Sequence, residues 1–443
     1  MREQSLTKNT QPSFDAIVIG GGPAGSVCAC RLAGLGFSVL LLEKSQFPRL
    51  HVGESTVPYL TELLDRLGVL EAVEQEGFVC KRGVEFSDAR SDGFGRMDFD
   101  TAAPGQKTYA YNVDRPRFDA LLLKQAELRG VRVLDDAEVR EFLFDGERMC
   151  GVVYQTGGER RAARARFVVD ASGRAGLISR HFKLRRMNPR LRNMAVYQQF
   201  TGLIPGNNPS IAGDLVVTSH EEGWLWCMPI GEDLLSVGAV MPAAVLKGRD
   251  PQEVFAAHVE RSVRIRPRIQ GARPVFAQAK VESDWSYYSD RLAGPGFFLV
   301  GDAGCFVDPM FSGGVYFAMV AGFKAADVMS EILGGRDERE ARDWYEHFCK
   351  TAYDVYFRLV FDVYDSLGGD FMRLFGFYPC DPKYLTQTIL GDFWGRPDQP
   401  LLAHLRAQPG RQTFGEPFEV ITGCPIYPDT CFKVGDDLLA RAA

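Results

Sequence analysis

Residues 14–43 constrain the fold of this chain more than any other stretch. They contain a short β-branched run, a turn with the spacing G-x-G-x-x-G, a helical pattern and a second apolar run. Such apolar runs favour strands buried on both faces of a parallel sheet. The first glycine permits a tight turn, the second lets the backbone approach a pyrophosphate, and the third lets the helix pack on the strand. The stretch therefore predicts a dinucleotide-binding unit of strand, helix and strand.

The residues expected to hold the dinucleotide follow from this arrangement. Phosphates would bind at the amino end of the helix, where free amides and the helix dipole attract anions. Glu43 ends the second strand about 20 residues after the turn, where an acid accepts hydrogen bonds from the ribose. Glycines also gather at ordinary turns, so the whole order of elements carries the prediction. The candidate residues are Gly20, Gly22, Pro23, Ala24, Gly25, Glu43 and Lys44.

The length and charge of the chain limit its other properties. Its 443 residues exceed a single hydrophobic core, so we expect roughly two or three parts. The formal charge of -6, with no long basic run, argues against nucleic acid or an anionic membrane as a partner. No segment reaches about eighteen consecutive apolar residues, and residues 1–12 are polar, so we expect a cytoplasmic protein.

The ten cysteines are scattered, without C-x-x-C or mixed Cys/His spacing. Cys28 and Cys30 fall in the first expected helix, where small core residues belong. We therefore expect neither structural disulfides nor a metal site.

The rest of the chain separates into regions of different pattern. Segments 138–144, 150–155 and 163–169 alternate as the strands of an antiparallel meander, and residues 57–76 are expected to form a helix. Residues 193–240 alternate strongly, as a sheet that covers a substrate cavity would. From residue 341 the chain is helical and densely aromatic, and after Gly410 we expect an extended tail.

Two further strands end in an acid and a glycine turn. Residues 167–169 lead into Asp170-Ala171-Ser172-Gly173, and residues 297–300 lead into Gly301-Asp302-Ala303. A carboxylate at a strand terminus is a natural acceptor for sugar hydroxyls. Together with the opening turn, these two acid turns have the order and spacing of those in the glutathione-reductase-like flavoproteins of the p-hydroxybenzoate hydroxylase type, which the chain therefore resembles.

That resemblance covers about residues 14–345 and implies an α/β fold. An FAD-binding domain would carry a substrate-side β-sheet inserted at about 190–285, and residues 346–443 would form an α-helical C-terminal region with the extended tail. Beyond the opening turn, the residues assigned to the FAD site are Arg49, Ser55, Arg117, Asp170, Gly173, Gly301, Asp302, Pro309, Gly313 and Gly314.

Several segments resemble a narrower family, the flavin-dependent halogenases. They are FPRLHVGES at 47–55, the segment around Lys81, GWLWCMP at 223–229 and FVDPMFSGGV at 306–315. The branch that acts on phenols and pyrroles fits better than the tryptophan branch, because Phe311 stands where the latter has a glutamate beside its substrate. Met228 replaces the isoleucine of the family's W-x-W-x-I-P stretch, which conserves volume.

The halogenase resemblance implies a two-component enzyme. A separate flavin reductase would supply reduced FAD, and chloride or bromide would be oxidised to hypohalous acid. Lys81 would guide this acid to an electron-rich phenol or pyrrole, by a hydrogen bond or as a chloramine. A lysine suits both roles, because an ammonium donates hydrogen bonds and a desolvated amine is nucleophilic. The substrate could be free or tethered to an acyl or peptidyl carrier protein, and the enzyme a monomer or homodimer.

The halide and the channel to the substrate are assigned through the same resemblance. Ser312, Gly313 and Gly314 open an apolar helix, whose free amides make an anion nest plausible. Trp224 and Trp226 lie two residues apart on one face of a strand, and with Phe311 they would line the channel.

Each assignment also has a purely structural interpretation. Lys81 could be a surface lysine beside Arg82, the tryptophans could be core residues, and residues 312–314 could simply pack on the flavin. The chain could instead be an FAD-dependent aromatic hydroxylase, a geranylgeranyl-reductase-like oxidoreductase or a flavin-binding protein without turnover. A second G-x-G-x-x-G for a nicotinamide is absent, which favours a separate reductase, although single-component hydroxylases of this fold also lack one.

Overall fold

A sheet of eight strands lies at the centre of the dinucleotide-binding part of the protein. The computed structural model describes residues 13–102, 107–204, 213–283, 286–395, 399–408 and 413–423. The strand order is β19-β20-β10-β1-β2-β7, with β9 beside β10 and β8 beside β9. The strands are β1 (Ser13–Ile19), β2 (Val39–Leu42), β7 (Arg132–Leu134), β8 (Ala137–Asp145), β9 (Arg148–Thr156), β10 (Glu159–Asp170), β19 (Ala293–Gly294) and β20 (Phe297–Leu299).

Strand β10 connects the two halves of this sheet. It first pairs antiparallel with β9, completing the predicted meander, and then runs parallel to β1 and β20. The register places Ile19 opposite both Leu42 and Asp170. The turns that follow β1, β2, β10 and β20 therefore converge at one carboxyl edge, where ligands of open α/β sheets bind.

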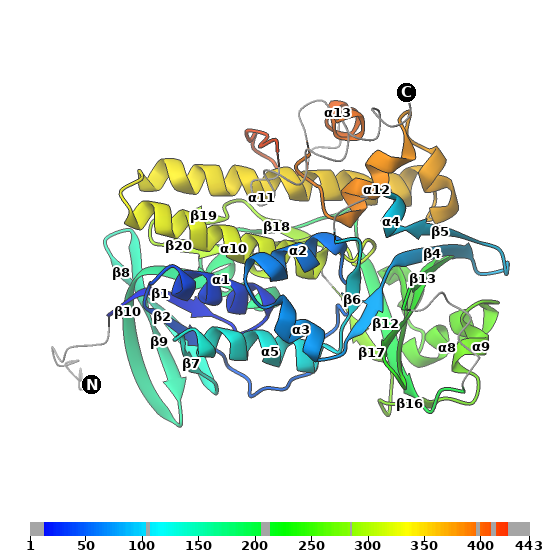
Figure 1. The fold of residues 1–443 in the computed structure, drawn as a ribbon, viewed down its shortest axis with the longest axis horizontal. Helices are drawn as coiled ribbons and strands as arrows, with labels where there is room; N and C mark the ends of the chain where they lie inside the picture. The colour runs from blue at the N-terminus through cyan, green and yellow to red at the C-terminus, as the bar shows by residue number, and fades with distance from the viewer. Residues whose placement is uncertain are drawn as a thin grey trace.

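Long helices pack beside this sheet. They are α1 (Pro23–Gly34), α5 (Arg115–Leu128), α10 (Gly314–Leu333) and α11 (Glu338–Phe361). Figure 1 shows α11, α10 and α1 lying one below the other. The approach of α10 to α1 depends on Gly322, where a Cβ would lie 2.3 Å from the carbonyl oxygen of Ala24.

The predicted helix over 57–76 is two helices, α2 (Pro58–Arg66) and α3 (Leu70–Gln75). Gly68 separates them with a φ of 68°, in the left-handed region that favours glycine. Buried apolar residues recur at helical spacing on both sides of this break, so periodicity alone did not reveal it.

A second sheet of eight strands stands at the right of Figure 1. Its order is β16-β12-β15-β14-β13-β4-β5, with β17 beside β12. The strands are β4 (Gly83–Asp88), β5 (Phe94–Asp98), β12 (Asn193–Thr201), β13 (Leu215–His220), β14 (Gly223–Gly231), β15 (Leu234–Pro242), β16 (Arg273–Pro274) and β17 (Lys280–Glu282). The sheet thus extends beyond the expected 190–285, because β4 pairs in parallel with β13.

Short elements connect these layers. Strand β3 (Val79–Lys81) pairs with β6 (Ala110–Asn112), and β11 (Arg185–Met187), β18 (Tyr287–Ser289) and β21 (Cys305–Phe306) form a small sheet. The others are α4 (Phe99–Ala102), α6 (Leu177–His181), α7 (Ala243–Leu246), α8 (Pro251–Arg261), α9 (Arg266–Ile269) and the 3-10 turns η1 (Gly173–Ala175) and η2 (Gly301–Ala303).

The C-terminal region is helical and continuous with the preceding part. The expected boundary between 345 and 346 falls inside α11, which passes into a π-helical turn, η3 (Asp362–Ser366). Then follow η4 (Phe371–Gly376), α12 (Pro382–Leu390) and α13 (Pro400–Ala407). Residues 413–423 form neither helix nor strand, and the remainder of the predicted tail lies outside the described residues.

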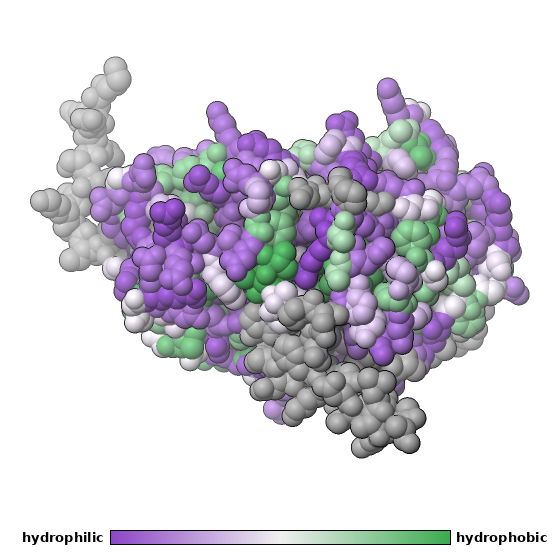
Figure 2. Space-filling model, turned by 90° about the horizontal axis from the view of Figure 1, so that it is seen from above, coloured by the Kyte–Doolittle hydropathy of each residue, from purple (hydrophilic) through white to green (hydrophobic). Residues whose placement is uncertain are grey.

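One face of the molecule is mainly polar. On the face shown in Figure 2, hydrophilic side chains predominate and hydrophobic ones form small separate patches. Among the helices of the described ranges, none is long and apolar enough to cross a bilayer.

Candidate active site

A cavity of about 700 Å³ lies at the carboxyl edge of the first sheet and reaches the second sheet. This volume is within the range of small-molecule pockets, about 300–1,000 Å³. The predicted residues that line it are Gly20, Gly22, Pro23, Ala24, Glu43, Lys44, Arg49, Ser55, Gly173, Trp224, Trp226, Asp302, Pro309, Ser312 and Gly314. The predicted residues outside the lining are Gly25, Lys81, Arg117, Asp170, Gly301, Phe311 and Gly313.

The first glycine turn is shaped as the spacing predicts. Gly20 has a φ of 105°, and a Cβ there would lie 2.4 Å from the carbonyl oxygen of Ala171. At Gly25 a Cβ would lie 1.9 Å from the carbonyl oxygen of Gly20, so this residue packs the helix on the strand and stays behind the lining. Gly22 caps α1 without a side-chain hydrogen bond, which leaves helix amides available to an anion.

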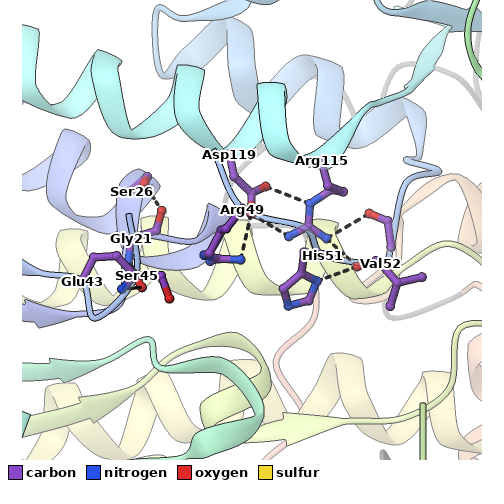
Figure 3. A network of polar contacts seen from close by, with 10 residues as sticks. Gly21, Ser26, Glu43, Ser45, Arg49, His51, Val52, Arg115 and Asp119 are labelled. Carbon is purple, nitrogen blue, oxygen red and sulfur yellow. Dashed lines mark hydrogen bonds and ion pairs between the residues drawn. The ribbon is translucent and has the colours of Figure 1, made fainter. Parts of the chain in front are cut away.

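Glu43 is held rigidly beside this turn. Its Oε2 accepts a hydrogen bond from the amide of Gly21, and its Oε1 accepts one from the amide of Ser45, both at 2.8 Å (Figure 3). The buried carboxylate also lines the cavity and has further lone pairs for hydroxyl donors.

Asp170 does not reach the cavity lining. Its carboxylate accepts hydrogen bonds from Ser172, through Oγ at 2.6 Å and the amide at 3.0 Å, and from the amide of Ile178 at 2.7 Å. Burial raises the pKa of Asp170, and these bonds favour its charged form. The residue shapes the turn that carries Gly173, which corrects its assignment as a direct cofactor contact.

The structure places Arg115 at the cavity and Arg117 away from it. Arg117 is half-exposed and forms an ion pair with Glu76 at 2.8 Å. The buried Arg115 binds both carboxylate oxygens of Asp119, at 2.8 and 3.0 Å. It also donates to the carbonyl oxygens of Val52 at 2.7 Å and Gly53 at 3.0 Å (Figure 3).

Arg115 therefore anchors the loop at 49–55. Arg117, which we expected to bind FAD, lies away from the cavity. The Arg–Asp spacing of four residues within one helix was the signal available in the sequence.

Glu54 lines the cavity and was assigned no role from the sequence, although it lies in the recognised 47–55 segment. Its oxygens accept hydrogen bonds from Gln199 Nε2 and Ser236 Oγ, each at 2.6 Å. Ser236 Oγ in turn accepts the indole N–H of Trp226 at 3.1 Å. Burial raises the pKa of Glu54 to about 7, while the bonds from Ser236 and Gln199 favour the carboxylate.

Lys81 lies directly behind the cavity wall. Its side chain is 1% exposed, so the surface interpretation is wrong. Its Nζ donates to Ser55 Oγ at 2.9 Å and to the carbonyl oxygen of Thr56 at 3.0 Å. Burial lowers the pKa of Lys81 to about 7, although the Asp214 carboxylate opposes this shift. Because Ser55 lines the cavity, one hydrogen bond separates the amine from it.

Trp224 and Trp226 project from β14 into the cavity lining, with ring centroids 6.1 Å apart. Trp226 has room because Gly238 is its partner on β15, where a Cβ would lie 2.2 Å from the indole. The indole N–H of Trp224 donates to the hydroxyl of Tyr364 at 2.9 Å.

The turn at 312–314 presents Ser312 and Gly314 to the cavity. Ser312 has a φ of 56°, and Gly313 caps α10 without a side-chain bond. Gly313 faces the ring of Phe317: a Cβ added at Gly313 would lie 3.1 Å from that ring. The buried Phe311 packs edge-on against Tyr356 at 5.9 Å, outside the lining.

Asp302 brings a second acid to the cavity. Burial raises its pKa to about 6, while nearby arginines, Arg115 first among them, favour the carboxylate. Gly301 precedes it with a φ of 57°, and its Cβ would lie 2.8 Å from that of Ala318, so this glycine lets α10 approach. Within the described ranges, no group of three or more His, Cys, Asp or Glu residues could hold a metal ion.

The parallel sheet, its glycine turn and the acids at its carboxyl edge define a protein that binds a dinucleotide. Residues 13–355 match the FAD binding domain family, which confirms the predicted α/β fold and FAD as the cofactor.

Similar proteins of known function show to which family of FAD-binding proteins the chain belongs. Tryptophan 2-halogenase of Chondromyces crocatus is 35% identical over 357 residues, which are 77% of this chain and 67% of that protein. Flavin-dependent halogenase armH2 of Armillaria mellea is 32% identical over 403 residues, 85% of this chain and 77% of that protein. The structure of the myxobacterial chondrochloren halogenase CndH has a TM-score of 0.75 at 31% identity, covering 80% of this chain and 83% of that one. The chain belongs to the flavin-dependent halogenases, enzymes that use FAD and halide.

Proposed function

We propose that this enzyme halogenates a phenol or a pyrrole with chloride or bromide, through hypohalous acid guided by Lys81. The observation that carries the proposal is a buried amine, with a pKa lowered to about 7, that is hydrogen-bonded to the cavity residue Ser55. Perturbed groups of this kind cluster at functional sites.

We assign the cofactor contacts to residues that line the cavity. The start of α1 would hold the pyrophosphate, Glu43 the adenosine ribose and Asp302 the ribityl hydroxyls. Reduced FAD, supplied by a separate reductase, would be held there and would supply the oxygen chemistry that converts halide to hypohalous acid. Ser312 and Gly314, at the amino end of α10, are assigned to the halide.

Lys81 can act in either of two ways. As an ammonium it has three donors, of which Ser55 and Thr56 occupy two; we assign the third to hypohalous acid, which would reach it past Ser55 at the cavity wall. As a free amine it can attack the halogen, releasing water and forming a chloramine; the aromatic carbon then takes the halogen and the amine recovers a proton from the ring. A pKa near 7 makes both forms accessible at neutral pH.

We assign Trp224 and Trp226, whose indoles both line the cavity, to the wall between this path and the flavin. Their paired indoles would keep the organic substrate away from the flavin, which disfavours hydroxylation. We assign the phenol or pyrrole class through the family resemblance alone, because Phe311 stands where the tryptophan branch has a glutamate beside its substrate.

The test supplies the protein with FAD, NADH, a flavin reductase, oxygen, and chloride or bromide. Phenols, pyrroles and tryptophan are offered free and as carrier-protein thioesters, and mass spectrometry reads the halogen isotope pattern. We expect halide-dependent product from a phenol or pyrrole. Halogenation of tryptophan alone contradicts the substrate class. Oxygenated product without halogen indicates the hydroxylase alternative, and FAD binding without any turnover indicates the non-catalytic one.

A further inference from the structure

Two tyrosines of the C-terminal region reach the segment that leads into the halide turn, the turn at 312–314 to which the halide is assigned. Tyr356 lies in α11, and Tyr364 lies in the π-helical turn η3 that continues it. Tyr356 is buried, and the side chain of Tyr364 is partly buried. Neither belongs to the motifs by which the sequence resembles its family.

Tyr364 connects a cavity wall to Asp308. Its hydroxyl accepts the indole N–H of Trp224 at 2.9 Å and lies 3.3 Å from Asp308 Oδ2, to which it can donate. Burial and the Asp308 carboxylate raise the pKa of Tyr364, so the hydroxyl keeps the proton that it donates.

Asp308 joins several parts of the protein. Its carboxylate is fully buried and accepts the amide of Met310 at 3.1 Å, which shapes its own segment. It also accepts from Asn193 Nδ2 at 3.4 Å, a residue of β12 in the second sheet. One acid therefore contacts the second sheet, the C-terminal region and the segment before the halide turn.

Tyr356 spans the same segment at the backbone. Its hydroxyl donates to the carbonyl oxygen of Asp308 at 2.8 Å and accepts the amide of Phe311 at 3.2 Å. The next residue, Ser312, has a φ of 56°, a conformation that a residue with a Cβ adopts only when its surroundings enforce it. The tyrosine supplies such an enforcing contact.

We propose that Tyr356 and Tyr364 are positioning residues that hold Trp224 and the halide turn in one fixed arrangement. The C-terminal region thereby sets halide affinity and the share of oxygen consumption that ends in halogenated product. This inference rests on the proposed function in assigning the halide to Ser312 and Gly314.

The variants are Tyr356→Phe and Tyr364→Phe, which remove one hydroxyl each. Tyr378→Phe is the matched control, because that hydroxyl also donates to a buried acid of the C-terminal region, Asp362, at 3.0 Å. The first measurement is the indole ¹H–¹⁵N resonance of Trp224 in the FAD-free protein, assigned through Trp224→Phe. We expect it to shift in Tyr364→Phe and to stay in place in Tyr378→Phe.

The second measurement is halide binding and coupling. We expect both variants to raise the KM for halide roughly three- to tenfold, the effect of one net hydrogen bond, with more hydrogen peroxide per halogenated product. Halide titration of the absorption spectrum of bound oxidised FAD should show the same weakening without turnover. Tyr378→Phe should match the wild type in each.

The outcomes separate the two proposals. If the wild type forms no halogenated product, the proposed function fails, while the Trp224 resonance still tests the positioning by Tyr364. An unmoved resonance in Tyr364→Phe, or a halide KM within twofold of wild type in both variants, overturns the inference. Should Tyr364→Phe not fold, Tyr356→Phe decides through the halide titration alone.

Discussion

Burial changes the chemistry of Lys81, the residue on which the proposed reaction depends. Its ammonium has exchanged water for a hydroxyl, a carbonyl oxygen and the ring of Phe99, whose centroid is 5.4 Å from Nζ. These partners stabilise the charge less than water does, so the neutral amine becomes accessible near pH 7.

The pKa of Lys81 should appear in the stability of the protein. It lies near 7 in the folded state and near 10.5 in the unfolded chain, so the unfolded chain binds more protons between these values. Wild-type stability therefore gains a contribution as pH rises through that window. In thermal unfolding, the Tm of Lys81→Met relative to wild type should be highest near about pH 6 and fall towards about pH 10.

Lys124→Met is the control for that series, because the Lys124 side chain is 64% exposed. Its Tm difference from wild type should change little over the same range. An equally flat difference for Lys81→Met would show that the amine has an ordinary pKa.

Arg115 and Arg117 should differ sharply in their effects. Arg115→Ala leaves Asp119 buried without its bidentate partner, which should cost about 3–5 kcal/mol of unfolding free energy and weaken FAD binding. Arg117→Ala removes a half-exposed ion pair and should cost under about 1 kcal/mol with FAD affinity unchanged. Urea denaturation and FAD fluorescence titration measure both, and similar losses in the two variants would contradict the placement of Arg115.

Among the elements, the unit of β1, α1 and β2 depends on close backbone approach. Gly25→Ala would place a methyl group 1.9 Å from the carbonyl oxygen of Gly20, so α1 must move and FAD affinity should fall at least roughly tenfold. Gly34→Ala, at the other end of α1, meets nothing within 4 Å and should leave FAD affinity unchanged. Calorimetric FAD titration tests the pair, and equal affinities would show that the turn tolerates a Cβ.

The elements that could be predicted from the sequence are those defined by local pattern. The glycine turn after β1, the meander of β8, β9 and β10, and the acid turns at Asp170 and Asp302 each follow from a few neighbouring residues. The membership of β4 and β5 in the second sheet could not be predicted, because the pairing of β4 with β13 joins distant segments.

In the site, too, local motifs could be predicted from the sequence and contacts between distant segments could not. The motifs locate Lys81, but its burial depends on Ser55 and Thr56, which only the fold brings to it. The local Lys81-Arg82 pair suggests a surface position instead. Glu54 and Tyr364 were missed as contributors for this reason, since their partners lie on other strands and on the C-terminal helices.

For the whole molecule, the cavity is lined by residues of both sheets. Strand β3, which carries Lys81, pairs with β6, which Figure 1 shows between the two sheets. The C-terminal helices contribute contacts that reach this junction from the side of α10. FAD, the proposed halide turn and Lys81 thus belong to different parts of the chain that only the complete fold brings together.

The protein should not reduce its own flavin with a nicotinamide. The chain has one G-x-G-x-x-G, and the cavity it forms is assigned to FAD. With FAD and NADPH but no reductase, adding an aromatic substrate should leave the rate of NADPH oxidation unchanged. Substrate-stimulated oxidation would indicate a single-component hydroxylase.

The proposed reaction depends on Lys81, which would direct the oxidised halogen to the substrate. The most direct test compares halogenated product formed per oxygen consumed in wild type and Lys81→Met, with the same reductase and halide. We predict that the variant consumes oxygen at a similar rate while its halogenated product falls by roughly a hundredfold, the lower range for loss of a positioned catalytic side chain. A product yield within twofold of wild type would show that Lys81 does not direct the halogen.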